Sequence, residues 1–323
     1  MEFFRHNKIY DFVKWSNYGI ILSAILFVGS LFLFFKPGFT LGVDFAGGTI
    51  VQIQYKEIAP LAQIREKLEN VESYKGAQVS EFGSPQEILI RLSVATSNVN
   101  QNIGEEIAEL LKDTGDLQIR RVDVVGPKVG NELKEKGILA LTLALISIMV
   151  YVAYRYEWRF ALASILALVH DVVIAAGAVI LFDVDLSLEV IAALLTLIGY
   201  SINDTIIIFD RIRETMSVKA SNDLKAVVNE ALSATLSRTM LTSLTVFFVV
   251  LTLYLFGGEI IKGFSLPMLV GSIVGSYSSI FVASKLVMLL GFDLKKYHQK
   301  LVENERKALE KKKMREMYER GRL

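Results

Sequence analysis

Asp204 is a carboxylate inside an otherwise apolar segment, which makes it the residue of this sequence with the clearest chemical potential. Together with Asn203 it lies in residues 190–213, which begin as an apolar helix long enough for the roughly 20 residues that a bilayer requires. An ionisable side chain at membrane depth costs on the order of 2.5–3.5 kcal/mol, so its presence indicates a functional site. Because Asp204 precedes Arg211 by seven residues, a rise of ~1.5 Å per residue places it about 10 Å inside the membrane boundary.

The polar residues of this segment share one helical face. Thr196, Tyr200 and Asp204 recur at intervals of four residues, and Asn203 adjoins them. A polar stripe faces lipid only at a high cost, so we expect it to face other helices or a wet cavity.

Arg238 is the expected partner of Asp204. It stands where the fifth predicted span enters the membrane, and Thr242, Thr245 and Thr252 continue its face. Antiparallel neighbouring spans share this end, so we expect the guanidinium and the carboxylate at similar depth. Burial favours a neutral carboxyl and a nearby guanidinium favours a charged one, so such a group can load and release a proton. The alternative is a static ion pair that fixes helix packing.

His170 and Asp171 form a second intramembrane pair, near the middle of the third predicted span. A protonatable histidine next to a carboxylate suits a proton relay. A polar clasp that holds helices in register explains the pair equally well. In the sixth span, Gly271, Gly275 and Ser279 recur at four-residue intervals, which predicts a face for close helix packing.

Composition and charge define the class of protein around these residues. The chain has 323 residues, 52% hydrophobic, with a mean hydropathy of +0.43 and a net charge of +1, which is typical of membrane proteins. It has no cysteine, three dispersed histidines and no phosphate-binding glycine loop. We therefore expect no cofactor, no metal site and no nucleic-acid partner.

Six apolar segments predict six transmembrane helices, with both termini on one side. Lys and Arg gather in the N-terminal segment, the loops at 154–160 and 210–238 and the C-terminal tail, whereas the loop at 183–189 has neither. Positive charge marks the cytoplasmic side, so the segment 36–136 is expected outside. The predicted spans are residues 18–35, 137–154, 160–182, 190–209, 239–256 and 265–286.

The remaining segments complete the predicted domains. Residues 1–17 form a cytoplasmic N-terminal segment, and residues 137–292 hold five spans with the cytoplasmic loop 210–238. The tail 293–323 is densely charged. It is expected to be a solvated cytoplasmic helix or tail, with contact to anionic lipid or a cytoplasmic partner as the alternative.

The segment 36–136 reads as one ferredoxin-like α+β domain. Alternating apolar residues predict strands at 51–55, 78–82, 88–94 and 117–125, and helical spacing predicts helices at 61–71 and 99–111. The order β-α-β-β-α-β is the ferredoxin-like arrangement. A shift of phase at Arg120 and Arg121 indicates a bulge in the last strand.

Glycine-rich turns connect this domain to the spans on either side. Asp44, Gly47 and Gly48 lie just after the first span, and Gly126 and Pro127 lie just before the second. Glycine permits backbone conformations that other residues resist, so these positions are expected to form turns, or a hinge between domain and membrane.

Five motifs together resemble the SecF family, the six-span subunit of the bacterial SecD–SecF complex. The resemblance covers about residues 18–291 and leaves the charged tail unexplained. The motifs, in chain order, are LGVDFAGGT (41–49), VVGPKVG (124–130), HDVV (170–173), GYSINDTIIIFDRIRE (199–214) and LSRT (236–239).

The resemblance implies a half-bundle of the resistance-nodulation-division type that uses the proton-motive force. In the family, the aspartate of the fourth span and the arginine of the fifth belong to the proton pathway, and these positions match Asp204 and Arg238. Implied partners are SecD, the SecYEG translocon, a YajC-type accessory subunit, membrane lipid and the translocating preprotein. The implied location is the bacterial cytoplasmic (inner) membrane.

Two other functions are compatible with parts of this pattern. The chain would be half of a proton-driven small-molecule exporter of the same superfamily if it pairs with another half. An intramembrane aspartyl protease is disfavoured, because the residues before Asp204 read Ser201, Ile202, Asn203 rather than a G-x-G-D-type context. We therefore expect no enzyme activity.

Overall fold

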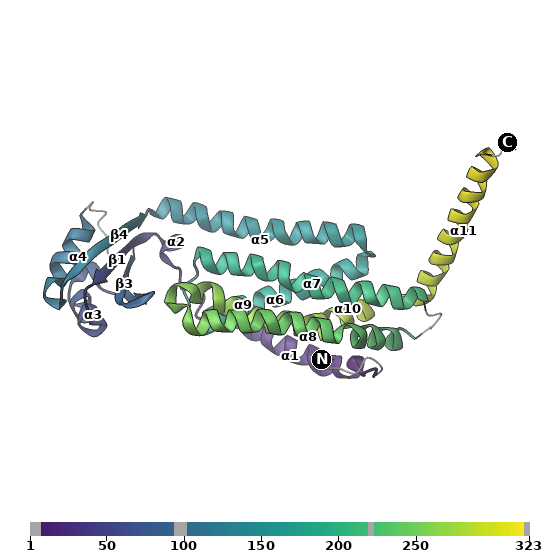
Figure 1. The fold of residues 1–323 in the computed structure, drawn as a ribbon, viewed down its shortest axis with the longest axis horizontal. Coiled ribbons are helices and arrows are strands. Elements are labelled where there is room, and N and C mark those ends of the chain that lie inside the picture. Colours follow the sequence, from purple (N-terminus) through teal and green to yellow (C-terminus); the bar gives the residue numbers. More distant parts are fainter. Residues whose placement is uncertain (1–7, 94–101, 219–222, 320–323) are drawn as a thin grey trace.

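The computed structural model describes residues 8–93, 102–218 and 223–319. Long, nearly parallel helices form a bundle, and a small α+β domain lies at one end of it (Figure 1). We call that end the domain end and the opposite one the far end. A single helix projects from the far end.

Six helices of the described residues are long and apolar enough to cross a membrane, as the hydropathy predicts. They run back and forth between the two ends (Figure 1). The first five are α1 (Phe12–Phe35), α5 (Pro127–Arg155), α6 (Trp158–Leu181), α7 (Leu188–Val218) and α8 (Leu224–Phe256). The sixth is α9 (Gly258–Ser278), which continues through a π-helical turn, η3 (Ser279–Ala283), into α10 (Ser284–Leu289).

The helices extend further than the predicted spans, most of all around 210–238. This region was expected to be a loop, but α7 continues to Val218 and α8 starts at Leu224. Buried apolar residues continue beyond the membrane boundary there, including Ile212, Met216 and Val228. Hydropathy detects the membrane core, whereas packing of an amphipathic face carries the helix beyond it. Residues 219–222 of the expected loop and the first residues, 1–7, lie outside the described residues.

The α+β domain has the predicted ferredoxin-like topology. Its elements are β1 (Gly48–Tyr55), α3 (Leu61–Glu69), η1 (Glu72–Tyr74), β2 (Gln78–Phe82), β3 (Ser84–Ser93), α4 (Ile103–Leu111), η2 (Lys112–Thr114) and β4 (Leu117–Val125). The sheet order is β2-β3-β1-β4, with all neighbours antiparallel. The two helices pack on one sheet face around a single apolar core.

Details of the sheet match the sequence pattern. Gln52 pairs with Arg121 while Ile53 pairs with Ile119, so Arg120 is the extra residue of a bulge, as predicted.

Beside the sheet, the hydroxyl of Tyr74 donates a hydrogen bond to Glu106 at 2.7 Å. Burial and this carboxylate raise the pKa of Tyr74 to about 12.

The domain is attached to the bundle by a compact junction rather than by an extended linker. Gly42 N–H donates to the C=O of Leu186 at 2.9 Å, and Leu186 N–H donates to the C=O of Thr40 at 2.8 Å. In the short helix α2 (Val43–Ala46), Asp44 Oδ2 accepts a hydrogen bond from the backbone N–H of Leu188 at 3.0 Å. Leu188 is the first residue of α7, so Asp44 satisfies a donor that the helix itself leaves free.

The glycines at this junction form the turns that the sequence predicts. Gly47 and Gly48 have φ angles of 78° and 148°, which residues with a side chain rarely adopt. Gly126 is the N-cap residue of α5, and Pro127 is the first helical residue, where its missing N–H costs nothing. Motion about these residues stays a prediction.

Close helix contacts at the bundle centre are made through glycine. A Cβ atom on Gly271 would lie 2.5 Å from Leu197 of α7, and one on Gly177 would lie 2.5 Å from the side chain of Ser30 of α1. Since real Cβ atoms do not approach so closely, these helices could not pack as they do with larger residues. The predicted close-packing face of the sixth span is confirmed.

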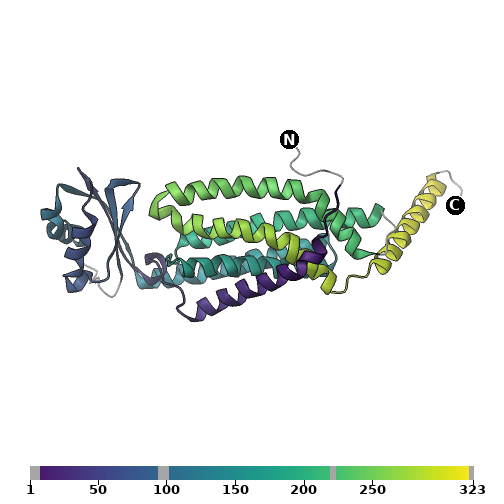
Figure 2. The same cartoon turned by 90° about the horizontal axis from the view of Figure 1, so that it is seen from below.

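The charged tail forms α11 (Leu294–Glu319), which leaves the bundle at the far end (Figure 2). Leu294 at its start is buried, and the His298 side chain bonds the backbone C=O of Met216 at 2.8 Å. Beyond this anchor its described side chains are exposed.

Candidate functional site

Asp204 is buried in the middle of the bundle, with 2% of its surface exposed. The hydroxyl of Ser243 on α8 donates a hydrogen bond to its Oδ2 atom at 3.2 Å. Ser243 in turn accepts a hydrogen bond at 2.6 Å from Ser276 on α9. A carboxyl group on α7 is thereby linked through hydroxyls to two neighbouring helices.

The structure does not bring Arg238 into contact with Asp204. Arg238 is exposed on α8, and over the described residues no ion pair joins the two side chains. Its charge acts on Asp204 only through space. The expected pairing is wrong for this structure because the α8 face that meets Asp204 carries Ser243, five residues and so 140° further around the helix at ~100° per residue.

The predicted polar stripe of α7 divides between two environments. Asp204 is buried, whereas Thr196 and Asn203 are exposed on the outside of the bundle. The hydroxyl of Tyr200 is buried beside Ser243 and Ser276 and has no hydrogen-bond partner among the described residues. The stripe therefore faces partly into this chain and partly away from it.

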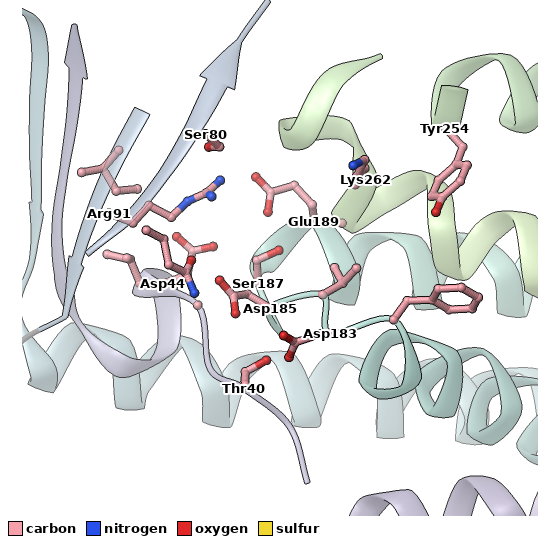
Figure 3. A pocket seen from close by; sticks show the side chains of 17 residues that line it. Thr40, Asp44, Ser80, Arg91, Asp183, Asp185, Ser187, Glu189, Tyr254 and Lys262 are labelled. Carbon is pink, nitrogen blue, oxygen red and sulfur yellow. The ribbon is translucent and has the colours of Figure 1, made fainter. Parts of the chain in front are cut away.

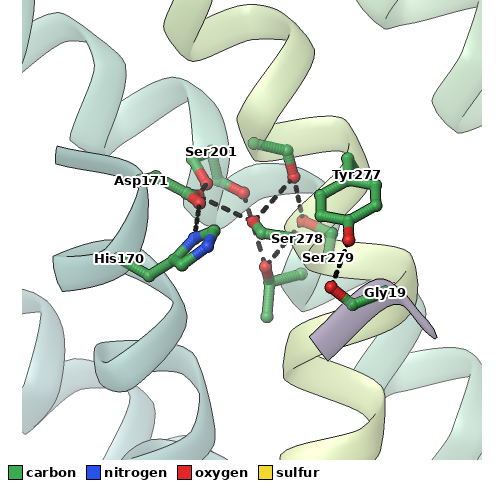
Figure 4. Close-up of polar contacts among 9 residues, drawn as sticks. Gly19, His170, Asp171, Ser201, Tyr277, Ser278 and Ser279 are labelled. Carbon is green, nitrogen blue, oxygen red and sulfur yellow. Dashed lines mark hydrogen bonds and ion pairs between the residues drawn. The ribbon is translucent and has the colours of Figure 1, made fainter. Parts of the chain in front are cut away.

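Asp171 is the centre of a second polar cluster and is completely buried (Figure 4). Nδ1 of its neighbour His170 lies 2.9 Å from Oδ1. Hydroxyls of Ser201 on α7 and Ser278 on α9 donate to Oδ2 at 2.5 and 2.8 Å. One carboxylate thus ties three helices together.

Around Asp171 the packing is dense and the chain departs from regular α-helix. Thr205 of α7 and Ser279 share a hydrogen bond at 2.9 Å, and Ser279 begins the π-helical turn η3. Phe27 stacks on the His170 ring at an interplanar angle of 7°, and the Nε2 atom of His170 is buried without a partner. Isolated π-helical turns are frequent at functional sites.

At the domain end, a cavity of about 410 Å³ lies between the α+β domain and the bundle, beside their junction (Figure 3). The bundle contributes Asp183, Asp185 and Glu189, and the domain side contributes Asp44 and Arg91. Figure 3 shows the side chains of Arg91 and Glu189 directed into the cavity from opposite sides. The junction residue Asp44 therefore lies at the edge of a charged space.

The sequence pattern identifies the carboxylates of Asp171 and Asp204 but not the hydroxyl groups that bond to them. Ser201, Ser243, Ser276 and Ser278 are the direct or indirect partners of Asp171 and Asp204. For one of them, Ser276, the four-residue spacing from Ser272 in the sixth span was a usable signal. In the described part of the chain, no group of three or more His, Cys, Asp or Glu side chains is placed to hold a metal ion.

The fold and these clusters define a polytopic membrane protein with one α+β domain outside its bundle and titratable groups at membrane depth. The family model "Protein export membrane protein SecD/SecF, C-terminal" matches residues 106–293, and the model "SecD/SecF GG Motif" matches residues 32–57. The chain belongs to the SecF family of protein translocase subunits.

Relatives match over almost the whole chain. Protein translocase subunit SecF of Helicobacter pylori is 57% identical over 323 residues, which is 100% of both chains. Protein translocase subunit SecF of Calditerrivibrio nitroreducens is 42% identical over 90% of this chain and 97% of that one. The match to the first relative includes the charged tail.

Solved structures of SecDF share the fold. The crystal structure of SecDF, a translocon-associated membrane protein from Thermus thermophilus, is 34% identical with a TM-score of 0.78. The match covers 88% of this chain and 39% of the SecDF chain. This chain therefore corresponds to well under half of the length of SecDF.

Proposed function

We propose that this chain acts with SecD as an auxiliary subunit of the protein translocase and uses the proton-motive force to promote late steps of preprotein export. The observation that carries the proposal is Asp204, a carboxyl group buried at membrane depth with a neutral hydroxyl of Ser243 as its direct partner. A carboxyl held by hydroxyls can gain or lose a proton without breaking an ion pair, because a hydroxyl both donates and accepts.

The charge pattern supports a cytoplasmic position for both termini. Arg155 and Arg159 lie at the far end of the bundle, on the same side as the basic helix α11. The loop between α6 and α7 at the domain end has no Lys or Arg. By the positive-inside rule the α+β domain lies on the outer side of the membrane. We propose the bacterial cytoplasmic (inner) membrane as its location.

Exposed polar residues in the spans support a partner that covers them. Thr196 and Asn203 on α7, and Arg238 on α8, are exposed in this chain although their helices cross the membrane. Such side chains face a protein interior or water rather than lipid. We assign this face to SecD, and Arg238 to a proton pathway that the two subunits complete together.

The α+β domain is where ion flow would act on a preprotein. One charge that crosses 100 mV releases about 2.3 kcal/mol, enough to bias a domain between two positions. Asp44, Gly47, Gly48, Gly126 and Pro127 form the junction about which it would move. Further proposed partners are the SecYEG translocon, a YajC-type subunit and the preprotein, and no enzymatic step is required.

Completion of a trapped preprotein tests this function directly. Vesicles hold the translocon, SecD and this chain; ATP is withdrawn midway, and a proton or a sodium gradient is then imposed. We expect completion with wild type and a loss of at least tenfold with Asp204→Asn, which cannot ionise. The matched control is Asp210→Asn, since Asp210 forms only a partly exposed ion pair with Arg155 at 3.1 Å.

Two results contradict the proposal. Equal completion by wild type and Asp204→Asn removes Asp204 from the coupling step. If a sodium gradient drives completion and a proton gradient does not, the coupling ion is sodium rather than the proposed proton, and the translocase role is unaffected. Co-purification of each variant with SecD checks that assembly is intact.

A further inference from the structure

Asp204 is connected to α9 by two serine hydroxyls in series. Ser243 donates to Asp204 Oδ2 at 3.2 Å, and Ser276 donates to Ser243 at 2.6 Å. Ser276 has a second acceptor, the backbone C=O of Ser272 at 2.8 Å. Because a hydroxyl carries one hydrogen, Ser276 can serve only one of these two acceptors at a time.

Because Ser276 has two acceptors, the hydrogen bonds that link it to Ser243 and Asp204 can all point in either direction. When Asp204 is charged, Ser276 donates to Ser243 and Ser243 donates to the carboxylate. When Asp204 is protonated, its O–H donates to Ser243, Ser243 donates to Ser276, and Ser276 donates to the carbonyl of Ser272. Reversal needs only hydroxyl rotations, and every hydroxyl hydrogen keeps an acceptor.

This property matters because an unsatisfied polar group is costly in a buried site. A lost hydrogen bond to a charged group costs about 1.5–3 kcal/mol, and a buried unsatisfied donor about 1–3 kcal/mol. A hydrogen-bond chain that satisfies both protonation states of Asp204 keeps their free energies close. A carboxyl group that loads and releases a proton requires this.

We propose that Ser243 and Ser276 are positioning residues for the ionisation of Asp204, acting as a reversible hydrogen-bond chain that satisfies both of its protonation states. The proposal rests on the proposed function of Asp204 and adds residues that the SecF match does not assign. Ser243 and Ser276 also line a groove of about 300 Å³ between α8 and α9.

In the described part of the chain, few other titratable groups lie around Asp204. On α7 itself Tyr200 lies one turn away, and α8 contributes the exposed Arg238. On α6, Asp171 is bonded by its neighbour His170 and by the hydroxyls of Ser201 and Ser278. From α9, Tyr277 donates its hydroxyl to Gly19 of α1, and α5 contributes apolar side chains such as Leu145 and Ile148 to the adjoining core.

The test is the pH profile of proton-driven preprotein completion in the vesicles described above. Ser243→Ala removes the direct partner of both protonation states of Asp204, but the bond to the charged carboxylate is the stronger of the two. The limb of the profile that reports ionisation of Asp204 therefore moves to higher pH by about one unit. Ser276→Ala removes the acceptor that the protonated chain needs, so the same limb moves to lower pH by a smaller amount.

Conservative and control variants separate positioning from packing. Ser243→Thr and Ser276→Thr retain the hydroxyl and are expected to restore the wild-type profile. Ser164→Ala is the control, because Ser164 is a buried serine that bonds only carbonyls of its own helix, α6. It is expected to leave the profile unchanged.

The outcomes distinguish this proposal from the function on which it rests. If Ser243→Ala and Ser276→Ala lower activity by the same factor at every pH, or leave the profile as in wild type, the proposed chain is wrong. If Asp204→Asn retains full proton-driven completion, the proposed function itself fails, whatever the serine variants do.

Discussion

At the scale of single residues, Asp171 and Asp204 illustrate two uses of a buried carboxyl. Among the described residues Asp204 has one hydrogen-bond partner, the hydroxyl of Ser243. Asp171 has three, from Ser201, Ser278 and His170, and is wholly inaccessible. A carboxylate that receives several hydrogen bonds is held in place by all of them, so more must break before it changes state.

We therefore expect Asp171 to act as a clasp between α6, α7 and α9. Ser278→Ala removes one hydrogen bond to the carboxylate and should lower the free energy of unfolding by about 1–3 kcal/mol. The measurement is thermal unfolding of the purified complex with SecD, compared with Ser164→Ala. Proton-driven completion should persist in Ser278→Ala; its loss without any fall in unfolding temperature would identify Asp171 as part of a proton relay instead.

At the scale of helices, the contact of α7 with α9 depends on the absence of a side chain at Gly271. An added Cβ would lie 2.5 Å from two methyl carbons of Leu197, which is itself fully buried. Either the buried Leu197 side chain or α9 itself would have to shift, and a shift of α9 moves the serines that reach Asp171 and, through Ser243, Asp204. The glycine thus acts on both polar clusters from a distance.

Gly271→Ala is expected to destabilise the bundle by about 1–3 kcal/mol, the usual cost of overpacking a core. Denaturant or thermal unfolding of the solubilised protein measures the change. Gly29→Ala is the control, because nothing lies within 4 Å of a Cβ at that position of α1. Equal stability of the two variants would show that α7 and α9 can shift apart freely.

At the scale of the whole molecule, the exposed stripe of α7 indicates that this bundle is incomplete as a single chain. Thr196 and Asn203 lie at membrane depth without cover from the chain itself. Helix α1, by contrast, exposes large apolar residues such as Ile21, Ile25 and Phe32, as expected for a surface in contact with lipid. The two sides of the bundle are therefore chemically different.

Single cysteines provide a direct probe of this difference, since the chain has no cysteine of its own. Asn203→Cys should react with a membrane-permeant thiol reagent in the isolated chain and be protected at least tenfold when SecD is present. Ile25→Cys on α1 should react equally with and without SecD. Equal reactivity of Asn203→Cys in both preparations would place SecD on another face.

The sequence by itself determined the elements of this protein. Hydropathy over windows of about 20 residues located six spans, and alternation at period two located the strands of the α+β domain, including the bulge at Arg120. The same local pattern marked Asp204 and Asp171 as buried titratable groups. These features depend only on neighbours along the chain.

Tertiary structure decided the partners. The rotation of α8 puts Ser243 rather than Arg238 against Asp204, and the packing of α9 through Gly271 brings Ser276 and Ser278 to the two carboxylates. Helix rotation and tilt follow from the fit of all the side chains in the bundle at once, which no local pattern contains. The sequence therefore showed which residues carry charge into the membrane, and only the packed helices showed which hydroxyls hold them there.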